Sequence, residues 1–165
     1  MRNLFLFLCF VCLLGSCANA QKKALDRVLE LEAQLMQVED ASSNTDLAEE
    51  VLAAYDEFLK AFPDADNHSE LLFKSGEVWK GLGAHLKSAK AFYQVHTKFP
   101  DSDLAPLALF QQAHCFEVLG QRLTAKKIYE EFIERYPNHP YEEQAKGMIQ
   151  NLHFSDEELI KQFQK

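Results

Sequence analysis

The sequence predicts an all-α protein built from helix-turn-helix repeats, and three observations support this fold class. An aromatic residue followed by proline recurs every 37 residues, at Phe62-Pro63, Phe99-Pro100 and Tyr136-Pro137. The apolar residues before each pair are spaced by three and four, as on one face of a helix. A glycine lies 17 residues before the second and third prolines, at Gly83 and Gly120. Periods of this size are typical of stacked units that share a core, so we expect a solenoid of about three repeats of 37 residues.

Residues 1–20 have the pattern of a secretory signal peptide. Arg2 supplies a positive start, Leu4 to Leu14 form an apolar run of 11 residues, and small residues follow. A membrane-spanning helix needs about 20 apolar residues, so this run is too short to cross a bilayer. We therefore expect an exported protein that lies outside the cytoplasm after the signal is removed.

Two cleavage sites overlap at the end of this signal. Leu14-Gly15-Ser16-Cys17 resembles a bacterial lipobox, in which Cys17 is acylated and becomes the first residue. Ala18-Asn19-Ala20 instead suits the ordinary signal peptidase, which would release a free protein beginning at Gln21. The first alternative, which we adopt, predicts a periplasmic lipoprotein anchored through Cys17. The second predicts a free periplasmic protein.

An N-terminal helix and a loop are expected over residues 21–45. Between Lys22 and Glu39, five apolar residues alternate at spacings of four and three, which is the pattern of a short coiled-coil seam. They are Ala24, Val28, Leu31, Leu35 and Val38. The seam permits two interpretations: this helix packs against the repeats, or it joins copies of the chain into a homo-oligomer.

The repeats are expected over residues 46–153, and each complete unit has two helices. An apolar stripe recurs in the first helix, and a second stripe leads into the aromatic-proline pair, where proline ends the helix. The first-helix stripes are Leu72, Gly76 and Trp79, then Leu109, Ala113 and Phe116; the second-helix stripes are Ser88, Phe92 and Val95, then Ala125, Tyr129 and Phe132.

Two further helices are predicted after the last repeat. A terminal repeat needs a cover for its apolar face, and an apolar stripe with helical spacing supplies one. The stripe consists of Tyr141, Ala145, Met148 and Leu152. Ser155 and Glu158 then form a capping box, so we expect a C-terminal helix over residues 154–165.

These units resemble the tetratricopeptide repeat (TPR), whose signature is W-x2-L-G-x2-Y, then A-x3-F, then P. The corresponding residues are Leu72, Ser75, Gly76, Trp79, Ser88, Phe92 and Pro100 in one repeat, and Leu109, Gln112, Ala113, Phe116, Ala125, Tyr129 and Pro137 in the next. The period exceeds the usual value of about 34, and the extra residues fall between each proline and the next first helix. A longer connection there resembles the TPR subgroup of periplasmic Tol-Pal coordinators and outer-membrane assembly lipoproteins. That resemblance implies anchoring at the outer membrane and a role in cell-envelope constriction or outer-membrane assembly.

Composition and motifs argue against catalysis and against several classes of ligand. The formal net charge is −8, and such an acidic chain is a poor partner for nucleic acid or an anionic membrane surface. The six histidines show no metal-site spacing, and no phosphate-binding loop or nucleophile elbow is present. With the signal removed, Cys115 lacks a disulfide partner and occupies a core-type position. We expect no enzyme, no cofactor and no metal site.

The surface that remains for function is the concave face lined by the first helices of a TPR stack. Angles around each helix place eight residues on this face, away from the main core stripe. They are Glu70, Phe73, Glu77, Lys80, Leu107, Phe110, His114 and Glu117. Phe73 and Phe110 recur at one repeat position and permit two interpretations: packing between neighbouring repeats, or apolar anchors for a partner's segment.

The sequence therefore predicts a noncatalytic scaffold that binds other envelope proteins through this face and contacts the membrane only through a lipid on Cys17. The alternative is a structural envelope protein that self-associates through its N-terminal helix.

Overall fold

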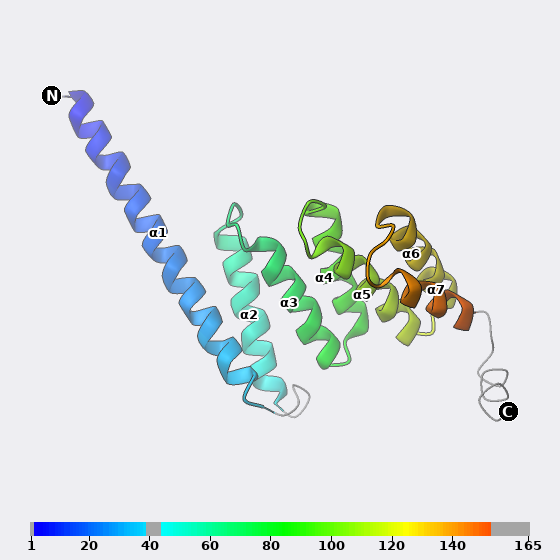
Figure 1. The fold of residues 1–165 in the computed structure, drawn as a ribbon. Helices are drawn as coiled ribbons and strands as arrows, with labels where there is room; N and C mark the ends of the chain where they lie inside the picture. Colours follow the sequence, from blue (N-terminus) through cyan, green and yellow to red (C-terminus); the bar gives the residue numbers. More distant parts are fainter. Residues whose placement is uncertain (1, 39–43, 153–165) are drawn as a thin grey trace. The chain divides into compact units, whose positions relative to one another are not determined.

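The described residues form seven helices and no strand, so the prediction of an all-α fold is confirmed. In the computed structural model these are residues 2–38 and 44–152, and for residues 2–17 only the backbone is described. The helices are α1 (Arg2–Leu35), α2 (Thr45–Ala61), α3 (His68–Gly81), α4 (His85–Lys98), α5 (Ala105–Val118), α6 (Arg122–Arg135) and α7 (Glu142–Asn151) (Figure 1).

The chain forms two compact units, residues 1–68 and 69–165, which are described separately. In the first unit α1 packs against α2. Val28 and Leu31 of the predicted seam are buried, with 1% and 8% of their surfaces exposed. The Tyr55 hydroxyl on α2 donates a hydrogen bond to Glu32 Oε1 at 2.8 Å. The centre of the seam is therefore covered within the chain, as the packing interpretation expects.

The aromatic-proline pairs end α2, α4 and α6. In each case the aromatic residue is the C-cap, and its backbone N–H donates to the carbonyl four residues earlier. The bonds run from Phe62 to Phe58, from Phe99 to Val95 and from Tyr136 to Phe132. The proline that follows has no N–H and its ring clashes with a continuing helix. Each pair therefore stops a helix where the 37-residue spacing predicts.

Gly83 and Gly120 reverse the chain between the two helices of each complete repeat. Their φ angles are 69° and 71°, in the left-handed region that glycine enters without the steric cost of a Cβ atom. The turn at Gly120 brings α6 against α5. The turn at Gly83 brings Ser88 of α4 within 2.8 Å of the Gly76 carbonyl of α3.

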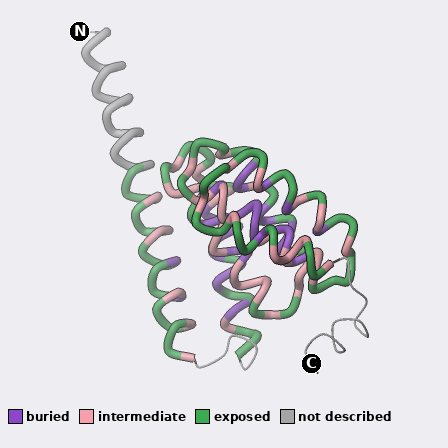
Figure 2. Tube along the Cα trace, turned by 45° about the vertical axis from the view of Figure 1, so that its right-hand side comes forward, coloured by how far each residue is buried: buried purple, intermediate pink, exposed green. Residues whose placement is uncertain are grey.

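In the second unit α4 packs on α5, α5 on α6 and α6 on α7. The buried positions follow the inner sides of these helices (Figure 2). The core around α5 and α6 contains Leu109, Phe110, Ala113, Ala125, Tyr129, Phe132 and Ala145. Ala145 comes from α7, and Met148 and Leu152 of the same predicted stripe pack against this cluster. As predicted, a helix covers the last repeat.

Trp79 lies nearer the surface than its stripe suggests. Leu72 and Gly76 are buried, whereas Trp79 is half-buried and Lys87 Nζ lies 4.0 Å from the centroid of its ring. Phe116, at the equivalent position, is also half-buried. The stripe reaches the surface at its last residue, where the indole contacts an ammonium group.

The predictions for the two ends of the chain are not tested by the structure. The C-terminal helix expected over residues 154–165, with Ser155 and Glu158, lies outside the described residues. Removal of the signal stays a prediction, whether the cut falls before an acylated Cys17 or after Ala20. No helix in the described part of the chain is both long and apolar enough to cross a membrane.

Candidate protein-binding surface

The eight predicted surface residues come from α3 and α5, the first helices of the two complete repeats. Burial divides them into three groups. Glu70 is exposed, Phe110 is buried, and the others are partly buried: Phe73, Glu77, Lys80, Leu107, His114 and Glu117.

Phe110 belongs to the core. Its exposed fraction is 5%, and its ring centroid lies 5.3 Å from that of Tyr129, 5.5 Å from Phe132 and 5.2 Å from Tyr141. With so little exposed surface, Phe110 offers almost no contact area to a partner protein. The angle around the α5 axis gave its direction correctly but could not show that Phe132 and Tyr141 fill the space it points into.

Phe73 also packs against its own repeat but retains some exposure. Its ring centroid lies 5.2 Å from that of Phe92 on α4, with the rings inclined at 60°. Such tilted aromatic pairs are favourable because the edge of one ring faces the negative face of the other. Both phenylalanines therefore pack mainly against the second helix of their own repeat, rather than between neighbouring repeats as the packing interpretation has it, and of the two only Phe73 stays partly exposed.

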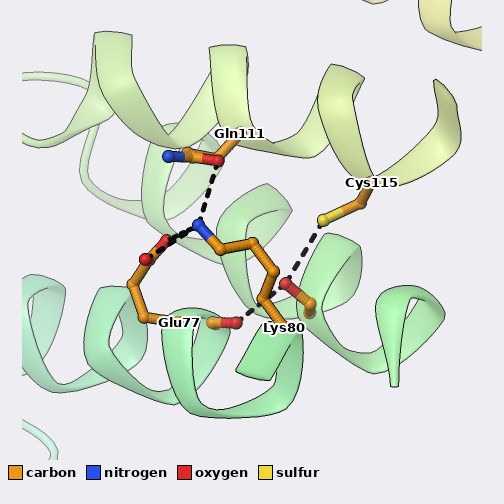
Figure 3. Close-up of polar contacts among 6 residues, drawn as sticks. Glu77, Lys80, Gln111 and Cys115 are labelled. Atoms are coloured by element: carbon orange, nitrogen blue, oxygen red, sulfur yellow. Dashed lines mark hydrogen bonds and ion pairs between the residues drawn. The ribbon is translucent and has the colours of Figure 1, made fainter. Parts of the chain in front are cut away.

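Lys80 links α3 to α5 on this face (Figure 3). Its Nζ lies 2.8 Å from both carboxylate oxygens of Glu77 and 3.3 Å from Oε1 of Gln111. The side chains of Lys80 and Glu77 are 27% and 40% exposed, so water screens the ion pair, and such pairs contribute about 0–1 kcal/mol. The predicted positive and negative groups therefore neutralise each other rather than presenting a charged clamp.

Glu117 accepts a hydrogen bond from the buried Tyr129 hydroxyl at 2.9 Å. Burial, and then the adjacent Glu117 carboxylate, raise the pKa of Tyr129. The phenol therefore stays neutral and acts as a donor. This hydrogen bond holds the Glu117 side chain next to Tyr129. Glu117 therefore contributes to the core and also lies at the edge of the surface.

Cys115 is a structural thiol, as predicted. It is fully buried, and its Sγ lies 3.3 Å from the Ser88 hydroxyl, which also reaches the Gly76 carbonyl (Figure 3). Burial raises the pKa of the Cys115 thiol. A thiol held protonated is a weak nucleophile, so His114 beside it in sequence does not form a reactive pair.

A buried polar pair between α4 and α5 was missed by the sequence analysis. His96 and Gln112 have 3% and 8% exposure, and Nε2 of His96 lies 2.8 Å from Oε1 of Gln112. Nδ1 faces Arg135 NH1 at 3.4 Å. Both contacts suit a neutral imidazole that donates from Nε2 and accepts at Nδ1. A comparison of the repeats could have revealed this pair, because the next repeat has two apolar residues, Ile133 and Ile149, at the equivalent positions.

The side chains that the structure describes offer no evident metal centre. Within residues 18–38 and 44–152, no three His, Cys, Asp or Glu side chains come together in a way that could hold a metal ion. The face of α3 and α5 instead combines one partly exposed phenylalanine with charged side chains that pair within the face.

Comparison with known proteins agrees with this architecture. Residues 107–139, which cover most of α5 and all of α6, match the tetratricopeptide repeat family. The fold is a TPR-like helical solenoid. The search of curated proteins found no match to the chain. TPR units generally mediate contacts between proteins, and the matched residues include Leu107, Phe110, His114 and Glu117 of the predicted surface.

Proposed function

We propose that this protein is a noncatalytic scaffold that binds partner proteins through the face of α3 and α5. The observation that carries the proposal is the TPR match over α5 and α6, in a stack whose neighbouring first helix, α3, is tied to α5 through Lys80 and Gln111. This contact and the packing of α4 on α5 order the helices around the surface, and a preorganised surface loses less entropy on binding.

The parts of this face that a partner would contact are Phe73, Glu77, Leu107 and His114. All four are partly exposed and come from adjacent first helices. Phe110 is left out because it belongs to the core. The expected ligand is an apolar or amphipathic segment of another protein, since the Glu77 and Lys80 charges already satisfy each other.

We further propose that the scaffold acts in the bacterial periplasm, at the outer membrane, in Tol-Pal-type constriction or in outer-membrane assembly. The support is the secretory signal pattern of residues 1–20, which contains the lipobox-like stretch Leu14-Gly15-Ser16-Cys17, together with the long connections between repeats. Self-association through the N-terminal helix is less well supported, because Val28 and Leu31 are already buried against α2.

Site-specific photocrosslinking in the native envelope tests the binding face. A benzophenone side chain at position 114 should yield a discrete adduct with a partner protein. The same group at position 127, an exposed site on α6, should not. Equal adducts at both positions, or none at 114 while the protein is folded and exported, would contradict the proposed face.

Cys17→Ser tests the anchor separately. This change spoils the lipobox but leaves Ala18-Asn19-Ala20 whole, so the wild type should carry acyl groups and partition into detergent, and the variant should be released at Gln21. Two acyl chains give stable anchoring where one gives only weak binding. Cys12→Ser is the matched control, because it removes a cysteine from the signal without changing the lipobox. A wild-type protein that already begins at Gln21 would rule out the tether.

A further inference from the structure

A hollow of about 270 Å³ lies between α4 and α5, and none of the eight predicted surface residues lines it. We call it the α4–α5 hollow. Its lining residues are Leu86, Ala89, Lys90, Tyr93, Gln112 and Phe116. Drug-sized ligands occupy pockets of about 300–1,000 Å³. The hollow is smaller than this range, and its size better suits one or two side chains of a partner protein.

The apolar wall of the hollow is exposed. Leu86 is 63% exposed and Tyr93 is 51% exposed, both on the outer side of α4. Large apolar side chains that gather on a surface mark binding sites more often than scattered ones do. Tyrosine in particular suits such a site because it offers a rigid apolar ring and a polar tip at low entropic cost.

The other repeats do not reproduce the aromatic part of this wall, although Leu86 has an exposed equivalent in Leu123. The positions equivalent to Tyr93 hold Asp56 in the preceding repeat and Glu130 in the following one, and Ala89 is replaced by Lys126 in the following repeat. Asp56 and Glu130 each have a lysine partner, Lys60 and Lys126. The tyrosine therefore breaks a pattern of solvated ion pairs, and the fold itself does not require an aromatic residue there.

The charge around the hollow is positive in an acidic protein. α4 carries Lys87, Lys90 and Lys98 and is the one helix of the described chain that contains no Asp or Glu, although the chain's formal net charge is −8. Within the described residues no carboxylate pairs with Lys90, which lies in the wall of the hollow. Such a site attracts acidic groups and disfavours basic ones.

We propose that the α4–α5 hollow is a second docking surface, which receives an acidic segment of a partner protein. One large apolar side chain of the segment enters the hollow beside Tyr93 and Phe116, and a flanking carboxylate meets Lys90. The apolar contact supplies most of the affinity, and the charges select the partner. This surface is independent of the face of α3 and α5.

A fluorescence anisotropy titration with a defined probe tests the proposal on the full chain. The probe is a short fluorescein-labelled peptide in which one central phenylalanine is flanked by aspartates and glutamates. Two control peptides replace the acids by their amides or the phenylalanine by serine. We expect the acidic probe to bind at least about tenfold more tightly than either control and to weaken as salt is added.

Substitutions locate the binding. Tyr93→Glu installs the residue type found at position 130 and should weaken the probe about tenfold or more, as should Lys90→Glu. Lys127→Glu makes the same charge change at the equivalent site of α6 and should leave affinity within about twofold of wild type. A circular dichroism melt of each variant checks folding, and Lys90 is exposed, so its substitution keeps the test valid if Tyr93→Glu destabilises the helix.

Several outcomes would overturn the proposal. If Lys90→Glu and Lys127→Glu bound the acidic probe with equal affinity, or if the wild type bound the acidic and amide peptides equally, the charge of Lys90 would not contribute to recognition. Self-association lost on Tyr93→Glu would assign the hollow to a second copy of the chain. Tighter probe binding after Leu159→Ser would assign it to the chain's own segment Ser155-Asp156-Glu157-Glu158-Leu159. None of these outcomes depends on crosslinking at position 114, so the proposal for the hollow and the proposal for the face of α3 and α5 can each be disproved without the other.

Discussion

Two alanines in the repeat formed by α5 and α6, Ala113 and Ala125, correspond to Gly76 and Ser88 in the repeat formed by α3 and α4. The difference changes how the second helix meets the first. A Cβ atom added to Gly76 would lie 2.6 Å from Cε1 of Phe92, so the ring of Phe92 occupies the space that a methyl group would need. The Ser88 hydroxyl then bonds to the Gly76 carbonyl at 2.8 Å. In the α3–α4 pair an aromatic ring therefore lies against the backbone at Gly76, and a hydroxyl bonds to that backbone, where the α5–α6 pair has two alanines.

The central aromatic residue differs in a matching way. Tyr129 donates to Glu117, whereas the equivalent residues of the preceding repeat are Phe92 and Lys80. The α5–α6 repeat thus has a phenol and a carboxylate at these two positions, and the α3–α4 repeat has a phenyl ring and an ammonium group. Lys80 then finds its partners at Glu77 and Gln111 instead. At these two positions the buried hydroxyl is present only where a carboxylate can accept from it, since an unpartnered buried polar group costs about 1–3 kcal/mol.

The largest effects should come from removing the two aromatic rings. Phe92→Ala and Tyr129→Ala should each lower the free energy of unfolding by about 3–5 kcal/mol, because both rings are fully buried. Tyr129→Phe should cost only about 1 kcal/mol, the net worth of its hydrogen bond to Glu117. Urea denaturation followed by circular dichroism measures all three. An alanine variant as stable as the wild type would show that the ring is not part of a cooperative core.

Gly76→Ala separates close packing from helix propensity. Alanine in a helix is ordinarily favoured over glycine by about 1 kcal/mol. Here the added methyl group meets the ring of Phe92, and overpacking of a core costs about 1–3 kcal/mol. We therefore expect a net loss of up to about 2 kcal/mol in the free energy of unfolding. Phe92→Leu in the same background should recover part of that loss. A stabilised Gly76→Ala protein would show that the α3–α4 contact is looser than its geometry indicates.

The sequence predicted those features that repeat or that a single residue type enforces. Gly83 and Gly120 mark positive φ angles, and the prolines after Phe62, Phe99 and Tyr136 mark helix ends, because few residues can substitute there. Periodicity also identified the buried stripes.

The candidate site was predicted less well. A helical wheel gives the direction of Phe110 around α5 but not the neighbours that cover it, Phe132 and Tyr141. The pairing of His96 with Gln112 joins two helices, and nothing local in either helix reveals it. It could be found only by comparison with Ile133 and Ile149 in the next repeat.

This polar pair gives the next prediction. Gln112→Ile alone removes the acceptor of the buried His96 Nε2–H, so it should destabilise the protein by about 1–3 kcal/mol. His96→Ile with Gln112→Ile copies the next repeat and should be nearly neutral, because replacing both partners leaves no unpaired group. A double variant less stable than the single variant would contradict this account.

The same pair makes stability depend on pH. Burial, and more weakly the positive charge of Arg135, lower the pKa of His96, against the opposing effects of Gln112 and Glu131. The unfolded chain, with a pKa of about 6.5, therefore binds this proton more readily than the folded one. Stability should fall as the pH drops below about 6.5. The double variant should lose less stability between pH 7 and pH 5 in parallel urea titrations. Identical pH profiles would show that His96 is not the group responsible.

The smallest effect should come from Lys80, which distinguishes the two repeats at their surface. Lys80→Ala removes the contacts to Glu77 and Gln111, but Glu77 is 40% exposed and water can solvate its carboxylate once the lysine is gone. The expected loss is therefore at most about 1 kcal/mol, and it should shrink in high salt. Lys127→Ala on α6 is the matched control, because that lysine is exposed, and it should change stability by no more than about 0.5 kcal/mol. A loss of several kcal/mol at Lys80 that persists in high salt would mean that the link between α3 and α5 is a buried structural element. The face proposed for partner binding would then depend on Lys80 for its shape, and crosslinking at position 114 should disappear in the same variant.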